Sequence, residues 1–230
     1  MKKWISSFFS LLFPSYCMVC GTTLSESEEC LCLKCNFNMP RTNYHLQRGN
    51  PVEKAFWGQL PIERATSFFY YQRGSSYKSI LFDLKYKGRK EVGEVMGRMV
   101  AAELSQSDFF SSVDLIVPVP LHPDKQKKRG YNQSEWIAKG VQSITQLPID
   151  TGSVERTKNT ETQTQKSRIG RWENVKEIFV LHQPGQFVNK HILIIDDVLT
   201  TGSTIAACAS VFNEVEGAKV TVLTMALAQD

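Results

Sequence analysis

The chain has 230 residues, enough for one α/β domain with a packed core and a small additional module, but too few for two full-sized domains. Hydrophobic residues make up 42% of it and charged residues 22%, a composition that excludes disorder of the whole chain. The net charge of +4 is a mild basic excess, compatible with phosphate-rich ligands or a nucleic-acid surface but diagnostic of neither.

The first segment, residues 1–13 (MKKWISSFFSLLF), has two lysines followed by an apolar run. The run is too short to span a bilayer and has no small-residue cleavage site, which argues against a signal peptide. Its apolar residues at helical spacing predict an amphipathic helix that packs on the body. We therefore expect a cytoplasmic protein without a stable membrane span, and contact with the inner face of the membrane is the alternative. The residues on this stripe are Trp4, Ile5, Phe8, Leu11 and Leu12.

Five of the six cysteines lie between residues 17 and 35, and four of them form two C-x-x-C pairs, Cys17 with Cys20 and Cys32 with Cys35. A two-residue gap lets both thiolates of a pair point inward from one turn, so two pairs can supply four sulfur ligands to a structural zinc ion. Two disulfides are the alternative, but they require an oxidising compartment. Cys30 is close enough to Cys32 in sequence to replace it as a ligand.

Residues 41–61 are polar and predict a linker between this zinc-binding module, residues 1–40, and a larger domain, residues 62–230. In the larger domain, apolar runs alternate with segments of helical periodicity, which predicts a mostly parallel α/β sheet. The expected strands are 65–71, 114–120, 148–155, 177–181, 190–196 and 219–227, and the expected helices are 76–86, 91–104, 132–144 and 203–216.

The segment 192–204 (ILIIDDVLTTGST) places Asp196 and Asp197 at the end of a buried strand, before a turn of small hydroxyl residues and one glycine. Backbone N–H groups of this turn and the following helix N-terminus predict a phosphate site. The aspartates repel phosphate, so we expect them to face sugar hydroxyls, a magnesium ion, or both. The residues of the turn are Thr200, Thr201, Gly202, Ser203 and Thr204.

A strand-end aspartate also occurs in receiver-type phosphoacceptors and haloacid dehalogenases. Too little chain follows Asp197 for the remaining catalytic parts that those folds place after their first acidic strand. A merely solvated turn would leave the glycine and the four hydroxyl residues unexplained.

Two basic segments complete the expected site. Residues 117–133 carry four cations and then Gly130, where Arg129 is suited to grip a diphosphate bidentately; an exposed basic turn is the alternative for the lysines. Residues 156–174 have almost no apolar side chains and predict a mobile flap. Such a flap could close over an anionic ligand or lie along a nucleic acid, and its charge does not decide between these roles.

The segment 192–204 resembles the phosphoribosyl diphosphate signature of type I phosphoribosyltransferases, in which the acidic pair contacts the ribose and the turn holds the 5′-phosphate. Together with the cysteine pairs, further motifs resemble the ComF family over nearly the whole chain. That family is similar to phosphoribosyltransferases with a zinc-binding N-terminus and is associated with competence, the import of single-stranded DNA. These motifs are LKYKGR at 84–89, PVP at 118–120, RGYNQ at 129–133, T-x-x-Q at 160–163 and R-x-x-N-V at 171–175.

The resemblance implies a type I phosphoribosyltransferase fold with a small zinc-knuckle module. It places Arg129, Tyr131 and Asn132 on the diphosphate side, and Lys85 and Lys87 in the hood over the acceptor. Our main hypothesis is a phosphoribosyltransferase-like protein that binds phosphoribosyl diphosphate and Mg²⁺ and acts in DNA uptake, with Asp196 and Asp197 as catalytic residues. The alternative is a non-catalytic single-stranded DNA-binding component of the import machinery with DNA-uptake partners. Turnover and the acceptor are left open.

Overall fold

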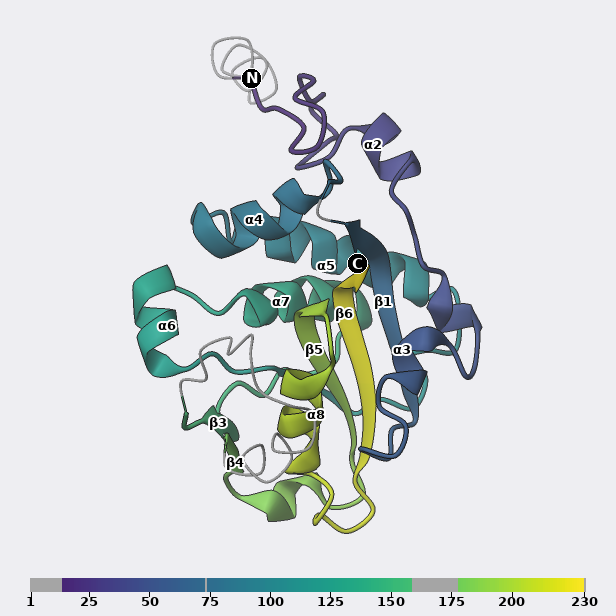
Figure 1. Ribbon diagram of the computed structural model, residues 1–230, viewed down its shortest axis with the longest axis vertical. Helices are drawn as coiled ribbons and strands as arrows, with labels where there is room; N and C mark the ends of the chain where they lie inside the picture. Colours follow the sequence, from purple (N-terminus) through teal and green to yellow (C-terminus); the bar gives the residue numbers. More distant parts are fainter. Residues whose placement is uncertain (1–13, 73, 159–177, 230) are drawn as a thin grey trace.

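The computed structural model describes residues 14–72, 74–158 and 178–229 (Figure 1). The predicted N-terminal helix and most of the predicted flap lie outside these residues. The strands are β1 (Arg64–Gln72), β2 (Leu115–Pro118), β3 (Val154–Arg156), β4 (Phe179–Leu181), β5 (His191–Leu199) and β6 (Lys219–Gln229). The α-helices are α2 (Leu33–Phe37), α3 (Pro51–Lys54), α4 (Lys78–Tyr86), α5 (Glu91–Leu104), α6 (Pro123–Arg129), α7 (Gln133–Thr145) and α8 (Ser203–Ser210), and the 3-10 helices are η1 (Tyr44–Leu46) and η3 (Pro184–Phe187).

A four-stranded parallel sheet forms the centre of the molecule, in the order β1-β6-β5-β2. All but one of the side chains of β5 are buried, as expected for a central parallel strand, and six of its nine residues are apolar. The strands β3 and β4 form a separate antiparallel pair beside the sheet. Since β5, α8 and β6 follow one another in the chain, the carboxyl end of β5 opens directly onto the start of α8 (Figure 1).

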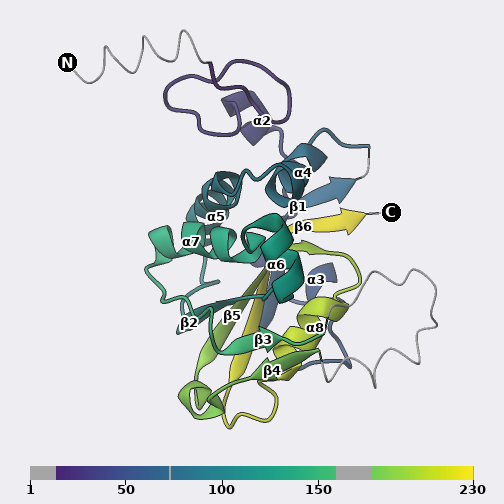
Figure 2. The same ribbon diagram turned by 90° about the vertical axis from the view of Figure 1, so that its left-hand side faces the viewer.

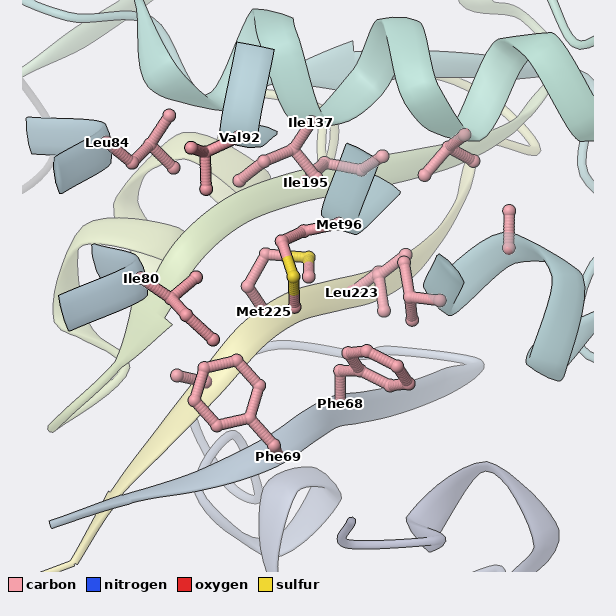
Figure 3. Packing of buried hydrophobic residues seen from close by; sticks show 14 of the residues in the cluster. Phe68, Phe69, Ile80, Leu84, Val92, Met96, Ile137, Ile195, Leu223 and Met225 are labelled. Carbon is pink, nitrogen blue, oxygen red and sulfur yellow. The ribbon is translucent and has the colours of Figure 1, made fainter. Parts of the chain in front are cut away.

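Helices cover both faces of the sheet (Figure 2). On one face, α4, α5 and α7 bury a core in which Met96 of α5 and Ile137 of α7 meet Ile195 and Leu223 of the sheet (Figure 3). On the other face, α3, α8 and η3 pack over alternate strand residues such as Ile194 and Val222. Successive residues of β5 and β6 therefore contribute alternately to two separate cores.

The cysteine module lies at one end of the molecule, next to α4 (Figure 1). Its buried residues belong to the same hydrophobic cluster as α4 and α5, and the hydroxyl of Tyr77 donates to the carbonyl of Cys35 at 2.8 Å. Arg98 of α5 pairs with Glu29 of the module. The module is therefore packed against α4 and α5 of the larger domain.

Most expected elements are present, and the predicted fold class is confirmed as a mostly parallel α/β sheet with a small N-terminal cysteine module. Several local differences occur. Of the expected strand 148–155, only β3 forms as a strand, and it pairs antiparallel with β4 outside the parallel sheet. Residues 41–61, expected to be irregular, contain η1 and α3, and Phe56 is fully buried there. The basic loop contains α6, which starts at Pro123 and ends at Gly130 in the left-handed conformation. The helix α8 ends at Ser210 rather than at residue 216.

No described helix has the length and apolar character that a bilayer crossing requires.

Candidate functional site

Asp196 and Asp197 lie near the carboxyl end of β5, and both side chains are buried. Asp196 is in register with Thr224 of β6, and the acidic pair lies on a central strand, between β6 and β2. Ligands of α/β folds bind at the carboxyl ends of such strands. The hydroxyl-rich turn follows directly.

Asp196 is held by donors from two elements. Ser134 Oγ, in the first turn of α7, donates to Asp196 Oδ1 at 2.9 Å, and the backbone N–H of Asp197 donates to the same oxygen at 2.9 Å. Burial raises the pKa of Asp196 to about 7, and the neighbouring charge of Asp197 adds to the rise. Sequence reasoning missed Ser134, although it directly follows the RGYNQ motif and occupies the start of a predicted helix.

Asp197 has a cation as its partner. Lys85 Nζ of α4 lies 2.9 Å from Asp197 Oδ2, and only 21% of the lysine side chain and 4% of the aspartate side chain are exposed. Burial opposes the charge of Lys85, but the attraction of Asp197 outweighs it, so the pKa of Lys85 is raised. The resemblance placed Lys85 over the acceptor; the structure places it on the acidic pair. Lys87, in contrast, pairs with Asp83 at 3.1 Å.

The turn after β5 contains a left-handed glycine in a close contact. Gly202 adopts φ +78°, and a Cβ there would lie 3.2 Å from Cε1 of Phe56, so the left-handed turn and the close approach both favour glycine. The hydroxyls of Thr201 and Ser203 are 3.0 Å apart. The side chains of Thr200, Thr201, Ser203 and Thr204 are exposed around the N-terminus of α8.

The three residues expected on the diphosphate side differ in their surroundings. Arg129 is half-buried, donates to Gln133 Oε1 and lies with its guanidinium carbon 6.0 Å from the ring centroid of Tyr86. Tyr131 is buried, and its hydroxyl donates to the carbonyl of Leu84. Asn132 is buried as well.

Asn132 joins the end of β2 to the start of α7. Its Oδ1 accepts from the N–H of Ser134 at 3.1 Å, and its Nδ2 donates to the carbonyl of Val119 at 3.0 Å. The structure thus brings Arg129 to the site surface, while Tyr131 and Asn132 support the elements around it.

Arg156, at the start of the predicted flap, is half-buried on β3, and the negative charge of Asp196 acts on its pKa. Burial is the main cause that lowers its pKa. Of the other cations in the segment 156–174, Lys158 is exposed. Lys166, Arg168 and Arg171 lie outside the described residues.

The four predicted zinc ligands come together. The sulfur atoms of Cys17, Cys20, Cys32 and Cys35 all lie within 4.8 Å of one another, and all six cysteines are free thiols. Cys20 Sγ and Cys32 Sγ are 3.7 Å apart. A tetrahedral site with metal–sulfur bonds of about 2.3 Å requires sulfur separations of about 3.8 Å, so the cluster could hold a metal ion. Cys32, and not Cys30, belongs to this cluster.

An exposed aromatic surface borders the site, and sequence reasoning missed it. The rings of Phe82 and Tyr86 on α4 have centroids 5.2 Å apart, and their side chains are exposed. Lys87 Nζ lies 5.7 Å from the Phe82 centroid, and Arg129 borders Tyr86. The signal in the sequence is the spacing of four residues, which places both rings on the helix face opposite Leu84.

The chain is similar to a DNA utilization protein and to two competence proteins. It is 31% identical to the DNA utilization protein YhgH of Escherichia coli over 196 residues, which cover 84% of this chain and 82% of the relative. It is 36% identical to competence protein F of Haemophilus influenzae over 93 residues, 40% of this chain and 41% of the relative. It is 24% identical to competence protein ComFC of Streptococcus pneumoniae over 225 residues, 88% of this chain and 95% of the relative.

Among solved structures, similarity extends to a Bacillus subtilis glutamine phosphoribosylpyrophosphate amidotransferase complexed with ADP and GMP, with a TM-score of 0.42 and 19% identity over 62% of this chain. The match spans 30% of that larger chain. An adenine phosphoribosyltransferase from Leishmania tarentolae matches with a TM-score of 0.39 and 13% identity, over 68% of this chain and 76% of the enzyme. No protein-family model matches the chain. The extent and identity of the YhgH match, with the cysteine pairs and the signature at the end of β5, show that the chain belongs to the ComF family.

Proposed function

We propose that the chain is a phosphoribosyltransferase-like protein that binds phosphoribosyl diphosphate with Mg²⁺ and acts in DNA uptake. One observation carries the proposal: a buried acidic pair at the end of β5 is followed by an exposed hydroxyl turn at the N-terminus of α8. The two halves of this site suit the two halves of a phosphorylated sugar.

The phosphate would lie in the turn 200–204. The N–H groups at the start of α8 and the hydroxyls of Thr201 and Ser203 are donors, and the helix dipole favours an anion there. Gly202 lets the backbone approach the phosphate without a side chain in the way. The 5′-phosphate of a pentose has the charge and size for this turn.

The acidic pair would bind the ribose hydroxyls and Mg²⁺. Carboxylate oxygens are the ligands that Mg²⁺ uses in proteins, and Asp196 and Asp197 together carry four of them near the carboxyl end of β5. The bound ion would neutralise charge on the diphosphate as the bond to the anomeric carbon breaks. Arg129 is placed to bind the diphosphate from α6.

In transfer, the two aspartates would act as catalytic residues by positioning the ribose and stabilising positive charge that develops on its ring. An acceptor nucleophile would form the new bond to the anomeric carbon as diphosphate leaves. Such a reaction would make the protein a glycosyltransferase.

The cysteine cluster is proposed to hold zinc with a structural role. Four thiolates fill a tetrahedral coordination shell and leave no position for a substrate. Because the module shares its hydrophobic core with α4, the metal would stabilise the helix that carries Lys85.

Calorimetry tests the binding proposal. Wild-type protein should bind phosphoribosyl diphosphate in the presence of Mg²⁺, and Asp196→Asn/Asp197→Asn should lose at least about tenfold in affinity, since each pair of charge-assisted contacts is worth about 1.5–3 kcal/mol. Glu214→Gln, an exposed change remote from β5 in the chain, serves as control. Equal binding by wild type and the double variant would refute the assignment.

The similarity to a DNA utilization protein and two competence proteins supports the role in DNA uptake. We propose that the chain acts in the cytoplasm, and contact with the inner face of the membrane is the alternative.

A second candidate function is binding of single-stranded DNA, favoured by the exposed rings of Phe82 and Tyr86 with Lys87 and Arg129 beside them. Bases stack on exposed aromatic rings, and neighbouring cations bind the backbone. Phe82→Ala/Tyr86→Ala should weaken binding of a fluorescent oligothymidine at least about tenfold, because each stacked base is worth about 1–3 kcal/mol. Trp57→Ala is a matched control, since Trp57 is exposed and has Lys54 Nζ 5.7 Å from its ring. Equal losses in both variants would exclude this surface.

A further inference from the structure

Lys85 connects α4 to the acidic pair of β5. It projects from α4, whereas Asp197 belongs to β5 on the sheet below, and the ion pair of 2.9 Å joins them. The neighbouring lysine of the same motif, Lys87, is 57% exposed at its side chain and pairs with Asp83 within its own helix. Of the two, only Lys85 links separate elements.

The ion pair compensates for charge burial. Two adjacent carboxylates in the centre of a sheet repel each other and lose their hydration, a cost that an ammonium group can offset. Lys85 supplies such a positive charge without any bound ion. Asp196 is satisfied differently, by Ser134 and a backbone N–H.

The proposed ligand requires the same oxygen atoms. Mg²⁺ bound to Asp197 would lie within a few ångströms of the ammonium group, and like charges at that separation repel strongly in a partly buried site. Mg²⁺ and Lys85 therefore compete for Asp197. Because Lys85 belongs to α4, displacement of this lysine from Asp197 would transmit ligand binding at the sheet to that helix.

We infer that Lys85 is a resident counter-cation of the acidic pair, which the Mg²⁺ of the ligand displaces from Asp197, breaking the ion pair that joins α4 to β5. The inference rests on the proposed function and deepens it, because it couples ligand binding to the loss of the Lys85–Asp197 ion pair. It also makes the site respond to a cation-loaded sugar diphosphate rather than to the anion alone.

Binding of Mn²⁺ alone, followed by electron paramagnetic resonance, tests the competition directly. Mn²⁺ shares the oxygen preference of Mg²⁺ and has little preference for the thiolates of the cysteine cluster. Lys85→Met keeps the length of the side chain and removes its charge, so this variant should bind Mn²⁺ at least about tenfold more tightly than wild type. Lys87→Met should bind Mn²⁺ as wild type does, and Lys85→Met/Asp197→Asn should lose the gain. Unchanged or weaker Mn²⁺ binding by folded Lys85→Met would overturn the inference.

A second variant and a measurement on the wild-type protein separate the effect of removing the Lys85 charge from misfolding of Lys85→Met. Lys85→Gln retains hydrogen bonding to Asp197 without the charge and should show the same gain in Mn²⁺ affinity. In the wild-type protein, Mg²⁺ with phosphoribosyl diphosphate should shift the side-chain NMR signal of Lys85 and leave that of Lys87 in place. A stationary Lys85 signal with a bound sugar diphosphate sinks this inference alone, whereas no calorimetric binding of the sugar diphosphate sinks the proposed function as well.

Discussion

Gly97 of α5 faces Gly140 of α7 so closely that a Cβ on Gly97 would lie 3.0 Å from the Cα of Gly140 and would overlap the carbonyl oxygen of Ile137. A Cβ on Gly140 would overlap the carbonyl oxygen of Glu94. The two helices thus cross backbone to backbone. Because α7 begins next to Ser134, which bonds Asp196, this crossing also fixes the acidic pair.

Either Gly97→Ala or Gly140→Ala should therefore lower the free energy of unfolding by about 2 kcal/mol or more, since the added methyl group forces the backbones apart. Urea unfolding measures the change. Gly152→Ala is the matched control, because a Cβ at Gly152 meets no atom within 4 Å. Similar stabilities of all three variants would contradict the close crossing.

The raised pKa of Asp196 makes stability depend on pH. Its ordinary pKa is 3.8, and burial with the charge of Asp197 raises it to about 7 in the folded protein. Between these values the folded state keeps a proton that the unfolded chain has lost, so the contribution of Asp196 to stability falls as pH rises from about 4 to 7. Above pH 7 the loss is complete.

Asp196→Asn removes this dependence. The variant should be at least about 1 kcal/mol more stable than wild type at pH 8, because each pKa unit corresponds to about 1.4 kcal/mol, and the gain should vanish near pH 4. Urea unfolding at both pH values tests this. A variant that is less stable than wild type at pH 8 would show that Asp196 is not destabilised by its burial.

The cysteine cluster predicts a difference between two neighbouring thiols. Purified wild type should contain one zinc ion, Cys32→Ser should contain little, and Cys30→Ser should keep it, because Cys32 and not Cys30 lies among the four clustered sulfurs. Metal content by mass spectrometry decides the matter. Loss of zinc in Cys30→Ser with retention in Cys32→Ser would reverse the assignment.

The conformation of Gly202 predicts a combined loss of stability and binding. Gly202→Ala places a Cβ at φ +78° and 3.2 Å from Phe56, so we expect about 1–2 kcal/mol of destabilisation. Affinity for phosphoribosyl diphosphate should fall more than in Phe56→Leu, which relieves the contact but keeps the turn. If calorimetry gives equal affinities for these two variants, the backbone of this turn does not hold the phosphate.

Much of the fold could be predicted from the sequence, because periodicity reports burial directly. The apolar run before Asp196 and the helical spacing of Val92, Met96 and Val100 correspond to β5 and α5. The segment 41–61 was harder, because its polar composition hides Phe56, which fits under α8 only once the sheet exists. The basic loop likewise becomes α6 because His122 and Gly130 cap its ends.

For the site, the sequence predicted the identity of the acidic pair and its turn but not their partners. The contact of Lys85 with Asp197 joins residues far apart in sequence, so no local pattern reports it. The hydroxyl of Tyr131 reaches the carbonyl of Leu84 instead of facing the site surface, and Asn132 caps α7. These outcomes depend on how α4 and α7 pack, which the motif alone does not contain.

The order of the strands has a consequence for biosynthesis. The strand β6 lies between β1 and β5, and the hydroxyls of Ser67 and Thr224, 2.5 Å apart, join residues separated by 157 positions. Until β6 has left the ribosome, the aromatic strand β1 has no partner strand in the parallel sheet. The nascent chain must therefore be kept from aggregating until translation reaches residue 229, and truncations within β6 should yield insoluble protein rather than a smaller fold.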